Sequence, residues 1–302
     1  MNLIHGWVNF DKPKGISSFK AVSLVKKYFL VKKAGHAGTL DPLASGVLPI
    51  AIGEATKTTS FMMGSIKTYN CLVEWGSETS TDDEEGEVIK TSNRIPTKNE
   101  IELNLKNFIG KISQIPPKFS AIKVNGKRSY SIARKGETPN LQEREIEVKD
   151  LKLVEIKDNN QALIFIKCSK GTYVRSLVRD LGRKLGVFAH VKDLRRSSVG
   201  NFNEKNSISL DHLNEIEDDT QKISLVLPIE SALEKFIKLE VSLNIKQKLV
   251  NGVKIPLNEI LKFDEKVKFR KNIMILAQIK KIPVALCIID NSEIKPFRVF
   301  NI

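Results

Sequence analysis

The chain has 302 residues, of which 41% are hydrophobic, and a formal charge of 49 − 35 = +14. This length predicts two domains, or one large domain with an appendage, and so basic a composition is typical of proteins that bind nucleic acid. No apolar run reaches the ~18–20 residues of a membrane span. The N-terminus resembles no signal peptide, and the three cysteines and four histidines form no metal or disulfide pattern. We therefore expect a cytoplasmic protein rather than a membrane or secreted one.

The first elements are a strand at 6–10 and a helix that begins near Ser17 or Ser18. Next comes a loop in which Gly35 and Gly38 precede a single carboxylate, Asp41, and a proline follows it. The glycines permit sharp turns, and the proline favours an extended backbone at Asp41. Such a stiff loop suits chemistry in which one carboxylate meets a reacting carbon. The alternative is an ordinary turn in which Asp41 caps the next segment.

Residues 67–76 read as a strand because Tyr69 and every second residue after it, up to Trp75, are apolar. An acidic run, 78–87, follows, and we interpret it as a solvated hairpin tip without a catalytic role. Residues 97–100 have the pattern of a capping box and predict a helix that Gly110 ends.

Residues 115–136 interleave six cations with Phe119 and Tyr130. Cations can meet phosphates and aromatic rings can stack on bases, so the segment suits nucleic acid. A solvated basic loop explains the same composition equally well.

Two alternating segments, 145–156 and 161–168, predict strands, and a helix follows with Thr172 as its N-cap. Arg175 falls in the first turn of that helix, where a cation is poorly placed in the helix dipole. This misfit suggests an outside anion, for which Asp41 is a candidate, although a surface arginine is the default interpretation.

The composition of the sequence changes in the C-terminal part. Residues 226–237 read as the last helix of a first domain, and strand-like runs at 272–279 and 283–289 follow. Residues 236–302 contain 13 Lys and Arg against 6 Asp and Glu, which is +7 of the total charge. We expect a small basic domain rich in β-strands.

Taken together, these motifs resemble the bacterial tRNA pseudouridine-55 synthases of the TruB type. The matching blocks occur in the family's order and include Tyr130; they are 11–18 (DKPKGISS), 35–42 (GHAGTLDP), 67–69 (KTY), 116–126 (PPKFSAIKVNG), 170–177 (KGTYVRSL) and 190–196 (HVKDLRR). The tail resembles the family's PUA-type RNA-binding domain more loosely, through 283–286 (PVAL) and 295–300 (KPFRVF).

The resemblance implies an α/β (α+β) fold: a mixed, largely antiparallel sheet with flanking helices, plus a small β-rich, PUA-like domain. The corresponding domains are 1–237, which would be catalytic, and 238–302, which would bind RNA. An insertion at about 117–140 would close on the tRNA arm.

The implied reaction is the isomerisation of a uridine in the T arm of tRNA to pseudouridine, without cofactor or metal. Asp41 matches the catalytic aspartate, which would attack the sugar, attack the base, or act as a base at the sugar. Arg175 matches the arginine paired with that aspartate, and Tyr69 matches the tyrosine that stacks on the target base. Core packing is the simpler role for Tyr69, and both roles are compatible.

The remaining matches concern substrate binding. Tyr173 and Leu194 match residues that line the uracil pocket. His36 matches a histidine at the flipped-out nucleotides, although a plain turn histidine fits too. Lys12 matches a residue that supports the active-site loop. We expect tRNA as the partner, a monomer, and neither a membrane nor a protein partner.

Two other interpretations compete. A basic RNA chaperone could refold tRNA without chemistry, but pure binding rarely needs a carboxylate inside a basic cleft. A guide-RNA-dependent relative would work within a particle, and the absence of a long basic tail favours a stand-alone enzyme.

Overall fold

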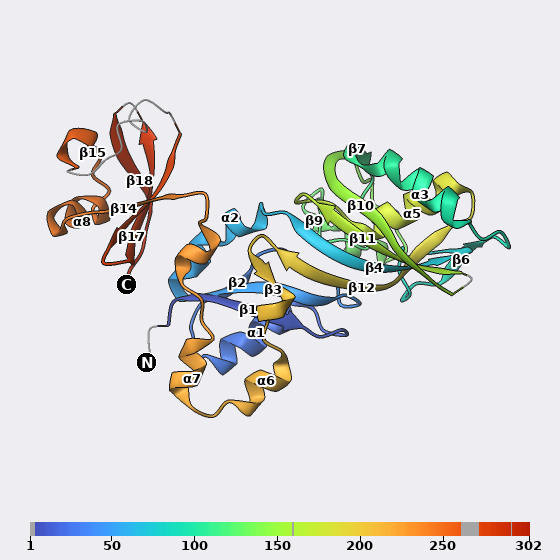
Figure 1. Cartoon of the computed structure of the whole chain (residues 1–302), viewed down its shortest axis with the longest axis horizontal. Helices are drawn as coiled ribbons and strands as arrows, with labels where there is room; N and C mark the ends of the chain where they lie inside the picture. Colours follow the sequence, from blue (N-terminus) through green and yellow to red (C-terminus); the bar gives the residue numbers. More distant parts are fainter. Residues whose placement is uncertain (1–3, 159, 261–271, 291) are drawn as a thin grey trace.

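The computed structural model describes residues 4–158, 160–260, 272–290 and 292–302. Figure 1 shows an elongated molecule, with a nine-stranded sheet at one end and a five-stranded sheet, which contains the C-terminus, at the other. This arrangement confirms the predicted fold class, a mixed sheet with flanking helices and a β-rich C-terminal part. The boundary between 237 and 238 stays a prediction. None of the helices in the described ranges is long and apolar enough to cross a membrane.

The large sheet has the order β1-β3-β12-β4-β11-β10-β7, with β2 beside β3 and β13 beside β12. Neighbours on this path are antiparallel except β3 and β12, which are parallel. The bounds of its strands are β1 Gly6–Lys12, β2 Ala34–His36, β3 Ser45–Ile52, β4 Lys67–Trp75, β7 Gly110–Gln114, β10 Arg144–Asp158, β11 Gln161–Cys168, β12 Ala189–Val199 and β13 Phe202–Asn203.

Burial follows the sequence pattern in the centre of this sheet. On β4 every second residue from Lys67 to Trp75 is buried, as the alternation predicts. On β3 seven of eight residues are buried, because β1 and β12 flank the strand and both of its faces are covered.

The helices cover the sheets and begin at conventional caps. Ser17 caps α1, and Thr97 and Glu100 form the predicted capping box at α3. The predicted cap of α5 is wrong: Tyr173, not Thr172, is the N-cap residue, and the side chain of Gln114 accepts a 2.9 Å hydrogen bond from its amide. The α-helices are α1 Ser18–Tyr28, α2 Thr59–Met63, α3 Lys98–Leu105, α4 Ser129–Ala133, α5 Val174–Leu185, α6 Leu210–Glu215, α7 Asp219–Ser224 and α8 Leu243–Val250.

The predicted helix over 226–237 is also wrong. Only Ile229–Ala232 are helical, as a short 3₁₀ segment that begins after Pro228. The proline disfavours a helical backbone at Leu227, which instead forms an antiparallel bridge with Trp7 of β1. The segment is apolar because Ile229, Ala232, Leu233 and Phe236 are buried in one cluster with Trp7, and not because it forms a helix.

The small sheet has the order β14-β16-β17-β18-β15. The strand that comes last in the chain, β18, leads to Phe300, which is buried in one apolar cluster with Trp7 of the large sheet. Two hydrogen bonds close this junction: Lys57 Nζ donates to Val299 O at 2.6 Å, and Asn301 N donates to Glu54 Oε2 at 2.8 Å. The strands are β14 Ile237–Glu240, β15 Ile255–Pro256, β16 Met274–Ile279, β17 Ile282–Asp290 and β18 Glu293–Val299.

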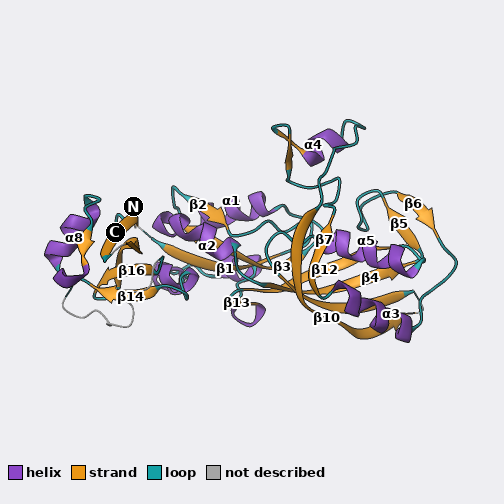
Figure 2. Cartoon of the chain, turned by 90° about the horizontal axis from the view of Figure 1, so that it is seen from above, coloured by secondary structure: helices purple, strands orange, loops and turns teal. Residues whose placement is uncertain are grey.

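Two small hairpins complete the fold. The acidic run begins within β5 Ser77–Thr79 and continues through the connection to β6 Val88–Thr91. The basic segment contains β8 Lys123–Val124, β9 Lys127–Arg128 and helix α4. Figure 2 shows α4 held away from the large sheet on an extended stem.

We expect Gly46→Ala to destabilise the protein strongly. Gly46 has φ +105°, and a Cβ there would lie 2.3 Å from the carbonyl oxygen of Arg196 on the paired strand β12. The expected loss is on the order of 3 kcal/mol or more in the free energy of unfolding, measured in urea. Gly136→Ala is the control, since Gly136 also has positive φ (+78°) but no atom within 4 Å of the added Cβ. Equal losses at both positions would show that backbone strain alone acts at Gly46.

Candidate active site

A cleft of about 870 Å³ opens where the Asp41 loop, β4, β12, the start of α5 and the root of the insertion meet. Five residues singled out in the sequence line it: Asp41, Tyr69, Tyr173, Arg175 and Leu194. They come from four segments that are far apart in the chain, so the fold brings together the side chains that the motifs predict.

The Asp41 loop is fixed by hydrogen bonds from neighbouring segments. Gly15 N donates to Pro42 O at 2.8 Å, and the hydroxyl of Ser18 accepts from Leu40 N and donates to Leu40 O, both at 2.8 Å. The carboxylate of Asp41 remains 31% exposed and faces the cleft. The loop is therefore rigid while its acid stays open to a substrate.

Lys12 lies beneath this loop and does not line the cleft. Its Nζ donates to the carbonyls of Pro13 and Ile16 at 2.8 Å, and more weakly to that of Pro42 at 3.5 Å. Burial lowers the pKa of Lys12 to about 8, and the charge of Asp41 opposes this shift. The contacts support the loop, in line with the role that the resemblance implies.

Arg175 donates from Nε to Oδ2 of Asp41 at 2.9 Å. The guanidinium is 5% exposed, and its other nitrogens donate to Thr81 O at 2.9 Å and Phe119 O at 3.0 Å. Burial lowers the pKa of Arg175, but the charges of Asp41, Asp83 and Asp82 together raise it above its ordinary value. The anion that the helix position suggested is therefore Asp41, and the contact is a single charge-assisted hydrogen bond.

The acidic run is solvated only in part: Glu84, Glu85 and Glu87 are exposed as predicted, and the prediction is wrong for its other three acids. Glu78, Asp82 and Asp83 are buried, with exposed fractions of 1%, 7% and 3%. They pair with arginines that recur every fourth residue on one face of α5, through contacts of 2.6 Å (Arg183 to Glu78), 2.9 Å (Arg179 to Asp82) and 3.3 Å (Arg175 to Asp83). The spacing of four between these arginines is a sequence signal that matches the acidic run.

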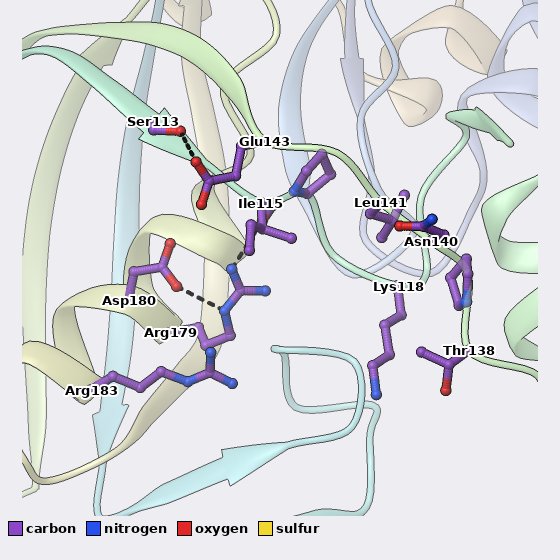
Figure 3. A pocket seen from close by; sticks show the side chains of 12 residues that line it. Ser113, Ile115, Lys118, Thr138, Asn140, Leu141, Glu143, Arg179, Asp180 and Arg183 are labelled. Atoms are coloured by element: carbon purple, nitrogen blue, oxygen red, sulfur yellow. Dashed lines mark hydrogen bonds and ion pairs between the residues drawn. The ribbon is translucent and has the colours of Figure 1, made fainter.

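A second pocket, of about 720 Å³, is lined by Arg179 and Arg183 of α5 and by residues of the insertion, among them Lys118 (Figure 3). Arg179 projects into it and donates to Ile115 O and Asp180 Oδ1, both at 2.9 Å. Glu143 accepts from Ser113 at 2.7 Å on its far wall. Of its charged side chains, Arg179 and Asp180 pair with each other, and none of the seven residues that the resemblance assigns to the site lines this pocket.

Tyr69 lies on the buried face of β4 and also lines the cleft, so both of its predicted roles are compatible with its place. Burial raises the pKa of Tyr69 to about 12, which keeps the phenol neutral. Tyr173 lies beneath the guanidinium of Arg144, whose carbon is 4.6 Å from the ring centroid. Leu194, on the adjacent strand β12, lies across from Cys71 of β4.

His36 does not line the cleft. It lies on β2, opposite Ile50 of β3, and is half-buried. Burial lowers the pKa of His36, and the charge of Arg196 adds to this shift.

Sequence reasoning missed four cleft residues as site residues: Lys67, Asp83, Arg144 and Arg196. Lys67 and Arg196 are in the quoted blocks, but charge alone does not distinguish a buried cation from a surface one. Asp83 was assigned to solvent, and Arg144 adjoins a predicted strand without any motif.

The architecture is similar to that of chains in Cbf5-containing complexes. A Cbf5-Nop10-Gar1 complex matches with a TM-score of 0.72 and 27% identity, over 98% of this chain and 83% of that chain. The archaeal box H/ACA sRNP Nop10-Cbf5 complex has the same TM-score at 24% identity, over 98% and 86% of the two chains, and shows the fold alone. The architecture of this chain is thus that of the chains matched in the Cbf5 complexes.

Comparison of the amino-acid sequence identifies the protein family. Residues 26–174 match the "TruB family pseudouridylate synthase (N terminal domain)", and residues 175–234 match the "tRNA pseudouridylate synthase B C-terminal domain". Relatives called tRNA pseudouridine synthase B occur in Ehrlichia chaffeensis (43% identity, 99% of this chain, 100% of the relative) and Wolbachia pipientis (37%, 99% and 99%). The chain belongs to the TruB family of tRNA pseudouridine synthases and is an isomerase.

Proposed function

We propose that this enzyme converts uridine 55 in the T arm of tRNA to pseudouridine, with Asp41 as its catalytic residue. The observation that supports this most directly is the ion pair between Asp41 and the buried Arg175 inside a basic cleft. In the proposed reaction the C1′–N1 bond breaks, the uracil turns, and C5 bonds to C1′. C5 then loses its proton to solvent and N1 gains one, so that the mass does not change.

The cleft suits a base that has left its stack, which the chemistry requires because the reacting atoms are otherwise covered. In this proposal the uracil stacks on Tyr69, and Tyr173 and Leu194 line its other sides. Arg175 keeps the carboxylate of Asp41 ionised and oriented through their hydrogen bond. Asp41 can then attack C1′, attack C6, or remove the proton at C2′; each role needs an ionised acid at this place.

The rest of the chain would bind the tRNA. Residues 1–237 form the catalytic domain in this proposal, and 238–302 form a PUA-like RNA-binding domain that carries about half of the net charge. The insertion at 117–140 would close on the T arm, with His36 at the flipped-out nucleotides and Lys12 supporting the loop. The enzyme would act as a monomer, without a cofactor and without a guide RNA.

Release of tritium tests this function. A tRNA transcript labelled at C5 of uridine, with no other RNA or protein added, should release one tritium per molecule. The same transcript with cytidine at position 55 should release none. A chaperone without chemistry would bind both transcripts and release nothing, and a guide-dependent enzyme would need added RNA.

We expect tRNA binding to weaken steeply with salt. Each phosphate neutralised on a single strand contributes roughly −0.7 to the slope of log K against log salt, and each on a duplex roughly −0.9. Filter binding between 50 and 300 mM KCl should give a steep slope for the full chain and a shallower one for a chain ending at residue 237. Because Phe300 packs in the cluster with Trp7, circular dichroism must first show that the shortened chain folds. Equal slopes for the two chains would show that the residues after 237 do not bind the tRNA phosphates.

A further inference from the structure

Two cations in the cleft are buried without a counter-ion. Lys67 is 7% exposed and Arg196 is fully buried, and both line the cleft. Within the described ranges, neither has a carboxylate oxygen within 4.0 Å, whereas Arg175 has those of Asp41 and Asp83. A buried charge without a counter-ion is costly, so these two side chains are placed at a cost in stability.

Their hydrogen bonds go mainly to neutral main-chain carbonyls, and Arg196 also bonds the phenol of Tyr69. Lys67 Nζ donates to Met63 O at 3.0 Å and Ser65 O at 2.8 Å, which leaves one of its three N–H groups free to donate. Arg196 donates to Val47 O at 2.8 Å, Gly38 O at 3.2 Å and Thr39 O at 3.3 Å. Its planar fork has five N–H groups, so capacity remains there too. The carbonyls orient both cations but do not cancel their charge.

The two cations are neighbours. A Cβ on Gly38 would lie 3.4 Å from Lys67 Cε and 3.9 Å from Arg196 Nη1, so both border the same glycine of the Asp41 loop. Burial and, after it, the charge of Arg196 lower the pKa of Lys67 to about 8. Two like charges side by side create a strong local preference for an anion.

Their position relative to Tyr69 indicates which anion. Lys67 and Tyr69 lie two residues apart on the same face of β4, a separation of about 6.6–7 Å along a strand. Arg196 lies directly across from Tyr69 on β12. A nucleotide whose base stacks on Tyr69 would therefore have its backbone at the distance of these cations.

We propose that Lys67 and Arg196 form a subsite for an RNA backbone phosphate that flanks the flipped uridine. This inference rests on the proposed function, since it places the target base on Tyr69. The phosphate would be the missing counter-ion, and its oxygens would accept hydrogen bonds from the free N–H groups. It would also fix the ribose near Asp41. The phosphate on either side of the uridine has the required chemistry, and an experiment separates the two.

The test uses three T-arm hairpins: an unmodified one, and two with a neutral methylphosphonate either 5′ or 3′ of the target uridine. Each is assayed with the wild type and with Lys67→Met for turnover and, by filter binding, for Kd. A charge-assisted hydrogen bond corresponds to roughly a 10- to 100-fold effect. We expect Lys67→Met to lower kcat/KM by this factor on the unmodified hairpin, and the methylphosphonate at one position to lower it equally for the wild type. The combination should show no further loss, because both changes remove the same contact.

Lys106→Met is the matched control, since Lys106 is exposed outside the cleft and its loss changes the net charge equally. Its effect should be the same on all three hairpins. A second readout separates binding from a structural role: Lys67→Met should leave the Tm unchanged or raise it, because it removes a buried unpaired charge. A lower Tm with additive losses at both linkages would show that Lys67 only holds the turn at 63–65, and would overturn the subsite. If the wild type bound the hairpins without turnover, the proposed function would fail while the Kd values still decided on the subsite.

Discussion

Asp41→Asn should abolish turnover and leave tRNA affinity nearly unchanged. The amide keeps the size of the side chain and can still accept from Arg175, but it provides neither a nucleophile nor a base. We expect kcat to fall at least roughly 100-fold, and Kd to change less than about threefold, because many cations share the binding. Tritium release and filter binding with the same transcript give both values.

Glu85→Gln is the matched control for this variant. Glu85 also lines the cleft, but it is exposed and makes no ion pair with Arg175. Its loss should leave turnover within a fewfold of the wild type. If Asp41→Asn retained more than about a hundredth of the activity, a covalent or basic role for Asp41 would be untenable.

Arg175→Lys should lower kcat by roughly 100- to 1,000-fold with little change in tRNA affinity. Lysine keeps the charge, but it cannot donate at once to Asp41, Thr81 and Phe119, as the planar guanidinium does. The carboxylate would lose its orientation, and the buried ammonium would compete for the same acceptors. The kcat and the Kd for tRNA should be measured under identical conditions, because the result depends on which of the two changes.

Arg183→Lys controls for the loss of a guanidinium in this helix. Arg183 lies two turns further along α5 and pairs with Glu78 at 2.6 Å, outside the cleft. It should change stability modestly and leave kcat intact. A higher Kd for tRNA with a normal kcat in Arg175→Lys would mean that Arg175 contacts phosphate. The pairing with Asp41 would then have no catalytic role.

The sequence predicted the parts of the site that local rules determine. Alternation placed Tyr69 on the buried face of its strand, and the capping box at Thr97 began its helix as expected. The misfit of Arg175 with its helix dipole pointed to an anion, and the fold supplies Asp41 as that anion. In each case the signal in the sequence lies within a few residues of the feature, although Asp41 itself is 134 positions from Arg175.

What the sequence did not predict depends on contacts between distant segments. Acidic residues near 80 look solvated until α5 brings arginines 97 and 105 positions away to Asp82 and Glu78. The apolar segment before 237 looks helical until Leu227 bridges to Trp7. Arg196 looks like a surface cation until β12 inserts beside β3. Local propensity carries no information on these partners.

The place of β12 in the sheet also bears on how the chain folds during synthesis. Its eleven residues, Ala189–Val199, lie between β3 and β4, which are made more than a hundred residues earlier. Until β12 leaves the ribosome, β3 and β4 each have an open inner edge, and an apolar strand with an open edge is prone to wrong pairing. Completion of the sheet and assembly of the cleft therefore coincide, because β12 joins the strand that follows Asp41 to the strand that carries Tyr69.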